Sequence, residues 1–326
     1  MSGIEISVVV PVYREADNVG PLCDRLLPVL ERLTGSFEVL FVDDGSTDAT
    51  LPAIAARHAA DPRVVAISFS RNFGKEIAIA AGLDHARGRA VVIMDADLQH
   101  PPETVAAFVE RWREGYVMVY GQRTDRAGES RVKRGFTHAF YRLFARFGET
   151  DLPEGAGDFR LIDRKGVHVL QALGERARFS KGLYAWIGFK SIGVPFTVDE
   201  RAFGTTKWSF RRLFRFAFDG ITSFSTVPLR VWTYIGGLVS IGAIGAAIYF
   251  AFRTLFFGSD VAGYPSLIVS ITFFAGIQLM SLGIIGEYVG RIFAEVKRRP
   301  LYVIGGTIGR VAHDLPMLRD DRRAQA

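Results

Sequence analysis

Two long stretches without a charged side chain set the first limit on what this chain can fold into. Residues 231–252 and 264–286 form runs of 22 and 23 uncharged residues. About 20 apolar residues in a helix cross the ~30 Å hydrocarbon core of a bilayer, so we expect two transmembrane helices. Only Arg253 and Asp260 are charged between the runs, whereas Arg291 and residues 297–299 are basic after the second. The positive-inside rule then predicts that both termini are cytoplasmic.

The remaining composition is consistent with a cytoplasmic domain at a membrane surface. The first ten residues contain no long apolar run, so no signal peptide is expected. A single cysteine, Cys23, excludes an intramolecular disulfide and fits a reducing compartment. The net charge is +6, and basic residues gather at 123–146 and 201–215 among aromatic ones. This pattern suits an anionic membrane surface, and no nucleic-acid-binding signature accompanies it.

Before residue 208, short apolar segments alternate with amphipathic ones. Such alternation predicts an α/β domain with a mostly parallel, Rossmann-like sheet covered by helices on both faces. The expected strands are residues 6–12, 37–42, 64–68 and 91–94, and the expected helices are residues 17–33, 47–60 and 75–86. From Ser209 to Thr226, phenylalanines and arginines recur at helical spacing, which predicts an amphipathic helix in the membrane interface.

An acidic pair follows the fourth predicted strand. Residues 91–94 are apolar, Asp95 and Asp97 come next, and Pro101-Pro102 prevents the strand from continuing. Ligands of open α/β sheets bind at this edge, and carboxylate oxygens beside phosphates suit Mg²⁺ or Mn²⁺. The pair therefore predicts a metal-assisted site for a nucleotide diphosphate, although Asp-x-Asp alone also occurs in solvated loops.

The first two predicted strands end in similar signals. Pro11-Val-Tyr-Arg-Glu15 closes one strand, and Asp43-Asp44-Gly45-Ser-Thr-Asp48 closes the other. Asp44 is the better candidate for binding a base or ribose, whereas Asp43, Gly45 and Asp48 also fit a turn and a helix cap. Neither strand is followed by Gly-x-Gly-x-x-Gly or a phosphate loop, which disfavours a dehydrogenase and a P-loop ATPase.

Together these motifs resemble a family 2 glycosyltransferase. Added to the motifs above are Arg71-Asn-Phe-Gly-Lys75, Asp95-Ala-Asp-Leu-Gln-His-Pro-Pro and Arg201-x-x-Gly-x-x-Lys207. The chain is most similar to the polyprenyl-phosphate glycosyltransferases, the group of dolichol-phosphate mannose synthase and bactoprenol glucosyltransferase. The resemblance covers essentially the whole chain and implies a GT-A-type fold. It divides the chain into a catalytic domain (1–208), an interfacial helix (209–228), two spans (229–290) and a cytoplasmic tail (291–326).

The resemblance also implies roles for individual residues. Asp95, Asp97 and Gln99 would hold Mg²⁺ or Mn²⁺, and Asp158, Asp97 and Arg201 would be catalytic. The nucleotide-sugar site would comprise Pro11, Tyr13, Glu15, Val42, Asp44, Asp95, Ala96, Asp97, Gln99, Arg123, Lys181, Arg201 and Lys207.

Several of these residues have a second interpretation. Arg201 and Lys207 suit a leaving diphosphate but also suit a membrane-facing basic patch. Arg123, Arg131 and Arg134 would bind the acceptor phosphate, or the last two would steady the amphipathic segment. Asp158 corresponds to the position usually assigned as a base, yet a lipid monophosphate with a second pKa near 6 scarcely needs deprotonation. Asp158 would instead orient the acceptor, or would be a turn carboxylate after two glycines.

The sequence thus predicts an inverting enzyme of the inner (cytoplasmic) membrane that moves one sugar from a nucleotide-sugar to polyprenyl phosphate. UDP-glucose and undecaprenyl phosphate are the favoured substrates. GDP-mannose, UDP-N-acetylhexosamine or a modified pentose donor are alternatives. A processive polysaccharide synthase would be expected to contain Gln-x-x-Arg-Trp, and a non-catalytic scaffold would be expected to lack the acidic pair. Small-residue repeats such as Gly286-x-x-x-Gly290 fit close packing of the spans and are compatible with a homo-oligomer.

Overall fold

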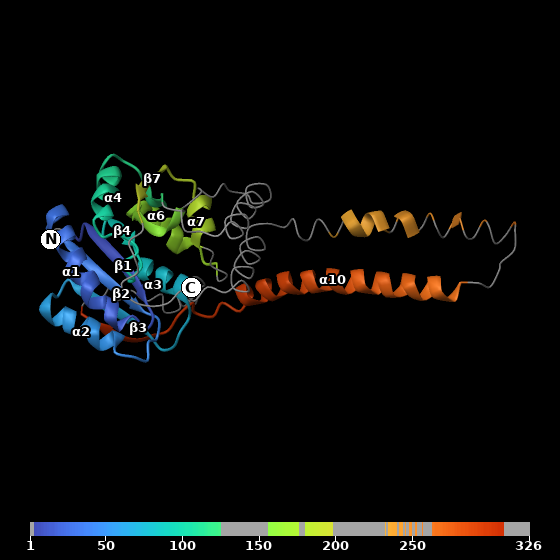
Figure 1. The fold of residues 1–326 in the computed structure, drawn as a ribbon, viewed down its shortest axis with the longest axis horizontal. Coiled ribbons are helices and arrows are strands. Elements are labelled where there is room, and N and C mark those ends of the chain that lie inside the picture. The colour runs from blue at the N-terminus through green and yellow to red at the C-terminus, as the bar shows by residue number, and fades with distance from the viewer. Residues whose placement is uncertain are drawn as a thin grey trace, which may run out of the picture.

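The computed structural model contains an α/β domain from which one long helix extends (Figure 1). It describes residues 3–124, 156–175, 180–197 and 263–309, with separate helical positions between 232 and 256. The first half of the domain contains β1 (Ile6–Val12), α1 (Ala16–Leu33), β2 (Phe37–Asp43), α2 (Thr50–Ala60), β3 (Val64–Phe69), α3 (Lys75–His85), β4 (Ala90–Ile93) and α4 (Thr104–Arg113). After these come β5 (Met118–Arg123), β6 (Ala156–Asp163), α6 (Arg164–Ala172), α7 (Ser180–Trp186), β7 (Ser191–Phe196), α10 (Tyr264–Val296) and β8 (Ile304–Ile308).

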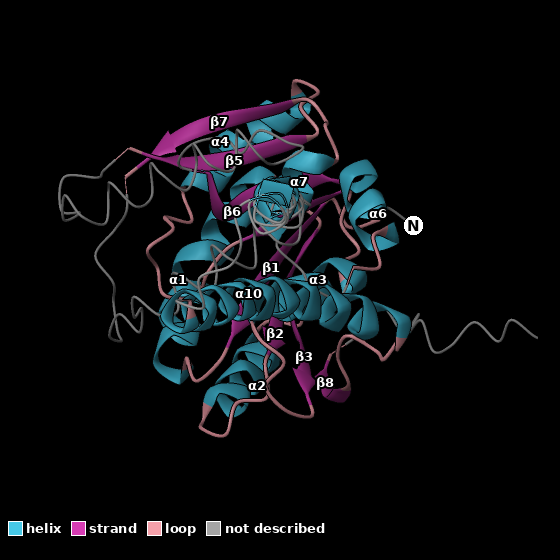
Figure 2. Cartoon of the chain, turned by 90° about the vertical axis from the view of Figure 1, so that its right-hand side faces the viewer, coloured by secondary structure: helices cyan, strands magenta, loops and turns pink. Residues whose placement is uncertain are grey.

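One eight-stranded sheet organises the domain. Its strand order is β7-β5-β6-β4-β1-β2-β3-β8, so β7 and β8 form its two edges (Figure 2). β4, β1, β2 and β3 pair in parallel, as do β5 and β7. β6 is antiparallel to both β4 and β5, and β8 is antiparallel to β3. The predicted mostly parallel α/β sheet is confirmed, with antiparallel strands inserted in its second half and at one edge.

The sheet is buried on both faces, which explains why its central strands are continuously apolar. Alternate residues of β1 point to opposite faces: Val8 and Val10 belong to the core beneath α1, α2 and α4, and Val9 belongs to the core beneath α3, α6 and α7. Helix α3 lies especially close to the sheet at Gly82, where a Cβ atom would stand 2.1 Å from Val9 Cγ1. Only glycine permits this approach, so the position of α3 on the sheet is fixed.

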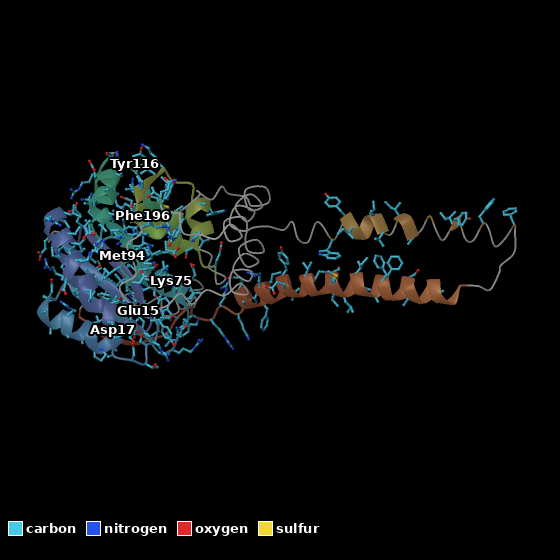
Figure 3. All side chains as sticks on the ribbon, in the orientation of Figure 1. Glu15, Asp17, Lys75, Met94, Tyr116 and Phe196 are labelled. Carbon is cyan, nitrogen blue, oxygen red and sulfur yellow. The ribbon has the colours of Figure 1, made fainter. Side chains whose placement is uncertain are left out.

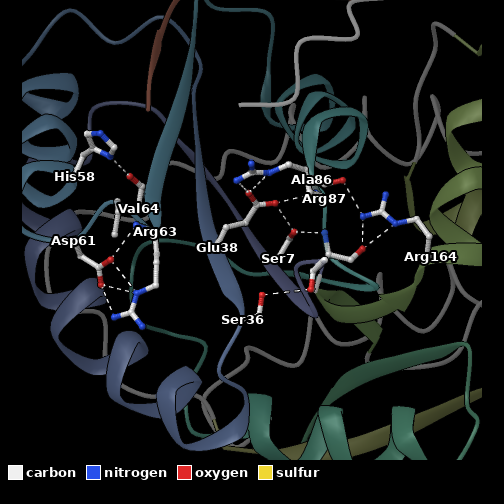
Figure 4. A network of polar contacts seen from close by, with 12 residues as sticks. Ser7, Ser36, Glu38, His58, Asp61, Arg63, Val64, Ala86, Arg87 and Arg164 are labelled. Atoms are coloured by element: carbon white, nitrogen blue, oxygen red, sulfur yellow. Dashed lines mark hydrogen bonds and ion pairs between the residues drawn. The ribbon is translucent and has the colours of Figure 1, made fainter. Parts of the chain in front are cut away.

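A buried polar network holds together the amino-terminal ends of β1 and β2 (Figure 4). Glu38 is 2% exposed and accepts hydrogen bonds from the Ser7 hydroxyl at 2.6 Å and from the Arg87 backbone N–H at 2.8 Å. Arg87 Nε also donates to Glu38 at 2.8 Å. Arg164 Nε donates to the Gly88 carbonyl at 2.8 Å, which ties α6 to the same end of the sheet. These contacts satisfy a charge that would be costly to bury alone.

Helix α10 corresponds to the second uncharged run, but it is longer than predicted. The run ends at residue 286, whereas the helix continues to Val296. The segment Phe273–Val296 is long and apolar enough to cross a membrane, with a mean hydropathy of 1.3 and none of its most apolar window buried. Over the residues that can be described, it is the single such helix. The first predicted span matches only a shorter apolar helix, Tyr234–Ala243, and the expected interfacial helix at 209–228 lies outside the described residues. Two spans are therefore not confirmed.

The segment after α10 returns to the sheet. The sequence predicts a cytoplasmic tail here, but Ile304–Ile308 forms β8 and pairs with β3, with Thr307 opposite Ile67. The Tyr302 hydroxyl donates to Asp84 Oδ2 at 3.0 Å, and its ring stacks on Phe69 with centroids 5.2 Å apart. Residues 297–301 alone therefore connect α10 to a part of the chain that is built into the domain.

Candidate active site

The candidate site lies at the carboxyl ends of the parallel strands. β4, β1 and β2 are neighbours in the sheet, and their ends lead directly to Asp95, Glu15 and Asp44, respectively. Sequence segments up to 80 residues apart are thereby brought to one edge, as the strand alternation predicts. Lys75, at the start of α3, lies in the half of the domain nearer to α10 (Figure 3).

The acidic loop after β4 has a defined shape. The Asp95 N–H donates to His100 Nδ1 at 3.2 Å, and Asp97 Oδ1 accepts from the Gln99 N–H at 3.2 Å. His100 stacks on Phe159 of β6, with ring centroids 4.7 Å apart. Burial lowers the pKa of His100, which agrees with a neutral ring whose Nδ1 accepts a hydrogen bond. The ring thus fixes Asp95 relative to β6.

Lys75 bridges the acidic loop and Asp158. Its ammonium lies 2.6 Å from Asp95 Oδ1, 2.9 Å from Asp95 Oδ2 and 3.2 Å from Asp158 Oδ2. Burial alone would lower the pKa of Lys75, but the two carboxylates outweigh burial and raise it. Likewise, burial would raise the pKa of Asp158, but Lys75, Lys181 and Arg160 together lower it to about 2. Both groups are therefore charged at neutral pH.

Asp158 belongs to a strand. It lies within β6, beside β4, so the interpretation as a turn carboxylate is wrong. Its side chain is 15% exposed, and its Oδ1 is buried with no hydrogen-bond partner among the described residues. The pairing of β6 with β4 places this carboxylate near Asp95. No local sequence pattern predicts that these two side chains lie close together.

Asp44 holds a loop of the site. Its carboxylate accepts hydrogen bonds from the N–H groups of Phe73 at 2.6 Å and Gly74 at 2.9 Å. Burial raises the pKa of Asp44, and these two N–H groups partly offset that effect. The Asp44 side chain thus fixes the backbone just before Lys75. Its predicted contact with a nucleoside stays a prediction.

The turn after β2 confirms the turn interpretation of Asp43 and Gly45, whereas the N-cap of α2 is Ala49 and not Asp48. Asp43 accepts from the Ser46 N–H at 3.0 Å, and Asp48 accepts from the Thr50 N–H at 3.2 Å near the start of α2. Gly45 has a φ of 69°, and a Cβ atom there would stand 2.5 Å from the Arg71 carbonyl carbon. Glycine is therefore required where this turn meets the loop of residues 71–74.

The other predicted nucleotide-binding residues differ in exposure. Tyr13 is 36% exposed at the end of β1, and the neighbouring Glu15 precedes α1. Val42 and Ala96 are 0% and 3% exposed, so both are buried at the edge of the site. Arg123 is exposed at the end of β5. Pro11 is half-buried within β1, and Gln99 is half-buried in the acidic loop.

The structure brings Lys181 toward Asp158 but leaves four predicted basic residues undescribed. Lys181 lies in the first turn of α7, and its charge helps to lower the pKa of Asp158. Arg131, Arg134, Arg201 and Lys207 lie outside the described residues, and their roles stay predictions.

A polar cluster next to Lys75, made by Glu76, Ser180, Arg160 and Tyr184, was not predicted from the sequence. Glu76 accepts from the Ser180 N–H at 3.1 Å and from its hydroxyl, which joins α3 to α7. The guanidinium of Arg160 lies 3.7 Å from the centroid of the Tyr184 ring. Lys75 closes the Arg71–Lys75 motif and begins α3, so the motif pointed to this place in the chain, but no local pattern identified the partners of Lys75 and Glu76.

The oxygen donors fit a divalent cation that is shared with a ligand. Among the residues that the structure describes, no three His, Cys, Asp or Glu side chains form a metal-binding group. Asp95, Asp97 and Gln99 supply oxygen atoms from one loop. Mg²⁺ is commonly held by one or two carboxylates, with water and substrate phosphates completing the shell. This donor set therefore suits an open site rather than a closed structural one.

Comparison with known proteins shows extended similarity. Residues 7–170 match the family model described as Glycosyl transferase family 2. An uncharacterized glycosyltransferase of Synechocystis is 47% identical over 94% of this chain and 96% of its own length. A prophage-derived bactoprenol glucosyl transferase of Shigella flexneri is 44% identical over 92% of this chain and 97% of its own length. A crystal structure of mannosyl-3-phosphoglycerate synthase from Rubrobacter xylanophilus is 22% identical, covers 67% of this chain and 72% of its own, and has a TM-score of 0.44.

Proposed function

The chain belongs to glycosyl transferase family 2, and on that premise we propose that it transfers one sugar from a nucleotide-sugar to a polyprenyl phosphate. The observation that carries the proposal is similarity over 92% of the chain to relatives named bactoprenol glucosyl transferases. This coverage extends well beyond the sheet domain. UDP-glucose is the proposed donor and undecaprenyl phosphate the proposed acceptor.

The site chemistry supports this reaction. Sugar transfer from a nucleotide separates a diphosphate leaving group from an oxocarbenium-like centre, so positive charge near the diphosphate stabilises the transition state. A bound Mg²⁺ or Mn²⁺, held by Asp95, Asp97 and Gln99, would supply that charge to the diphosphate. Arg123 and Lys181 would add cationic groups from β5 and α7, and Arg201 and Lys207 would do so from the following segment.

Asp158 has an orienting role in this proposal. With a pKa of about 2, it is already ionised at neutral pH. A polyprenyl phosphate is itself largely an anion there and is nucleophilic without losing a proton to the enzyme. Attack of a phosphate oxygen on the anomeric carbon, with departure of the nucleoside diphosphate, balances the inverting reaction. Asp158 would orient the cationic side chains that meet the acceptor.

Helix α10 supports a membrane location for the acceptor. Lys75 of the site lies in the half of the domain nearer to α10, and that helix contains an apolar segment long enough to cross a bilayer. We therefore place the catalytic domain and both termini on the cytoplasmic side of the inner membrane, with a first span preceding α10. Close packing of the spans in a homo-oligomer remains part of this proposal.

The deciding experiment offers the full-length protein several donors. Purified protein is incubated with undecaprenyl phosphate, Mg²⁺ or Mn²⁺, and radiolabelled UDP-glucose, GDP-mannose, UDP-N-acetylhexosamines or modified pentose donors. Label that enters organic solvent as a lipid bearing one sugar, and disappears with EDTA, is the expected result. Polymer growth would indicate a processive synthase. Absence of product with every donor, despite nucleotide binding, would favour a non-catalytic scaffold.

Asp97→Ala tests the metal assignment. Loss of one carboxylate ligand is expected to reduce the transfer rate by about 10²-fold or more, the effect typical of removing one transition-state electrostatic contact. Asp48→Ala is the matched control because the Asp48 carboxylate contacts Thr50 at the start of α2 and lies outside the acidic loop. A folded Asp97→Ala enzyme with the wild-type rate would exclude the assignment.

A further inference from the structure

Lys75 closes the Arg71–Lys75 motif, but neither the resemblance nor the proposed reaction assigns it a role. Its ammonium contacts both oxygens of Asp95, at 2.6 and 2.9 Å, and Asp158 Oδ2 at 3.2 Å. Asp95 belongs to the loop expected to bind the donor, and Asp158 lies on a different strand. Lys75 is therefore the physical link between two functional carboxylates.

The backbone around Lys75 is fixed from two sides. Asp44 accepts hydrogen bonds from Phe73 and Gly74, the two residues before it. Glu76, the residue after it, is held by Ser180. The contact of Gly82 with Val9 then fixes the rest of α3 against the sheet. The ammonium is thus presented to Asp95 and Asp158 by a rigid support, although its own side chain is 45% exposed.

Lys75 and a divalent cation would compete for the carboxylate of Asp95 but not for that of Asp158. Its carboxylate is bound by Lys75 in this structure, and the same oxygens are those expected to meet a divalent cation. An ammonium has three N–H donors and can give up one carboxylate while keeping another. Asp158 is only 15% exposed, and its Oδ1 has no partner within the described part of the chain, so it depends more on a nearby cation than Asp95, which is 29% exposed.

We propose that Lys75 is a positioning residue that couples donor binding to the orientation of Asp158. In the enzyme without donor, the Lys75 ammonium pairs with Asp95. When a donor binds with its divalent cation, the cation binds Asp95. Lys75 then pairs with Asp158 alone and holds it toward the acceptor. This inference rests on the proposed function for its second half. Its first half, competition between Lys75 and a cation for Asp95, is independent of which sugar is transferred.

Manganese binding to the full-length protein tests the competition directly. Free Mn²⁺ is measured by electron paramagnetic resonance without nucleotide, for wild type, Lys75→Met and Lys75→Arg. Removal of one positive charge about 4 Å from a divalent cation should tighten Mn²⁺ binding about 30-fold even if the two charges were screened as in bulk water. Lys75→Arg should stay near wild type. Lys165→Met is the matched control, because Lys165 is an exposed lysine in the first turn of α6.

Transfer kinetics test the coupling. In Lys75→Met, kcat should fall about 10²-fold because Asp158 is no longer held, while KM for the donor stays the same or falls because its cation no longer displaces an ammonium from Asp95. Lys75→Arg should recover part of kcat. Unchanged or weaker Mn²⁺ binding by folded Lys75→Met would overturn the competition, and an unchanged kcat would overturn the coupling.

A second variant decides the question if Lys75→Met does not fold. Asp158→Asn removes one of the two carboxylates that Lys75 contacts, so the ammonium should bind Asp95 more fully. Mn²⁺ binding should therefore weaken about threefold. Unchanged or tighter Mn²⁺ binding would overturn the inference. If wild type showed no transfer with any donor, the proposed function would fail, yet the Mn²⁺ titrations would still decide the competition.

Discussion

At the scale of single residues, Lys75 is the counter-ion of the acidic loop, because its ammonium contacts both Asp95 and Asp158. Asp95 and Asp97 stand out because they interrupt an apolar strand before two prolines, a local signal. The partnership of Lys75 with Asp95 and Asp158 depends instead on how α3, β4 and β6 meet in space. Asp158 was predicted to be functional through resemblance, whereas its place in a strand required the pairing of β6 with β4.

Cys23 offers a residue-scale prediction that concerns stability. Burial raises the pKa of its thiol to about 11, while in the unfolded chain the thiol titrates near its ordinary value of about 9. Between those values the unfolded state loses the proton and the folded state keeps it, so stability falls as pH rises. We expect this group to remove about 2–3 kcal/mol of the free energy of unfolding between about pH 8 and pH 11.

The measurement compares wild type with Cys23→Ala by denaturant unfolding across this pH range. The variant should start less stable because it opens a small cavity, but its stability should decline less steeply above pH 8. Other groups that titrate there are common to both proteins and cancel in the difference. Parallel curves for the two proteins would contradict the expected shift.

At the scale of elements, continuous apolar runs made the parallel strands predictable, and the exceptions have physical causes. β1 to β4 are buried on both faces, so each reads as an apolar segment bounded by turn residues. β8 reads Ile-Gly-Gly-Thr-Ile, and its glycines weaken the strand signal. Its partner β3 also lies more than 200 residues earlier in the chain, beyond any local pattern.

Glu38→Gln tests the network that joins the amino-terminal ends of β1 and β2. The substitution removes a buried charge that accepts hydrogen bonds from Ser7 and Arg87. Breaking a fully buried pair costs about 3–5 kcal/mol; because the Arg87 side chain is one-third exposed, we expect about 2–3 kcal/mol.

The control for this substitution is Glu31→Gln. Glu31 pairs with Arg63 at the surface, with side chains 52% and 37% exposed, and such pairs contribute about 0–1 kcal/mol. Denaturant unfolding of both variants measures the difference. Equal losses of stability would show that burial of Glu38 does not strengthen its network.

At the scale of the whole molecule, α10 is held to the catalytic domain at Tyr302. That side chain bonds to Asp84 and stacks on Phe69, and Asp84 lies near the end of α3, whose first residue is Lys75. A single helix therefore connects the active site to the segment that follows α10. The sequence predicted an anchored catalytic domain, but not this attachment, because it requires the tertiary contact of residues 218 positions apart.

Tyr302→Ala should loosen that attachment. We expect transfer to undecaprenyl phosphate in vesicles to fall by up to about 10²-fold, because misplacement of reacting groups by about 1 Å can cost that much, while transfer to a short, water-soluble prenyl phosphate is retained. Tyr116→Ala is the matched control: Tyr116 contacts Lys190 and lies farther from α10 (Figure 3). Equal losses with both acceptors would show that Tyr302 acts only on the fold of the domain.

The short connection formed by residues 297–301 limits which membrane the enzyme can act on. Five residues span at most about 18 Å even when fully extended, less than the thickness of one bilayer. An enzyme attached in this way would act only on acceptor lipid in the same bilayer as α10. In a mixture of vesicles, product would then form only in vesicles that contain both the protein and the acceptor. The local concentration of acceptor lipid would therefore set the rate of product formation in each membrane.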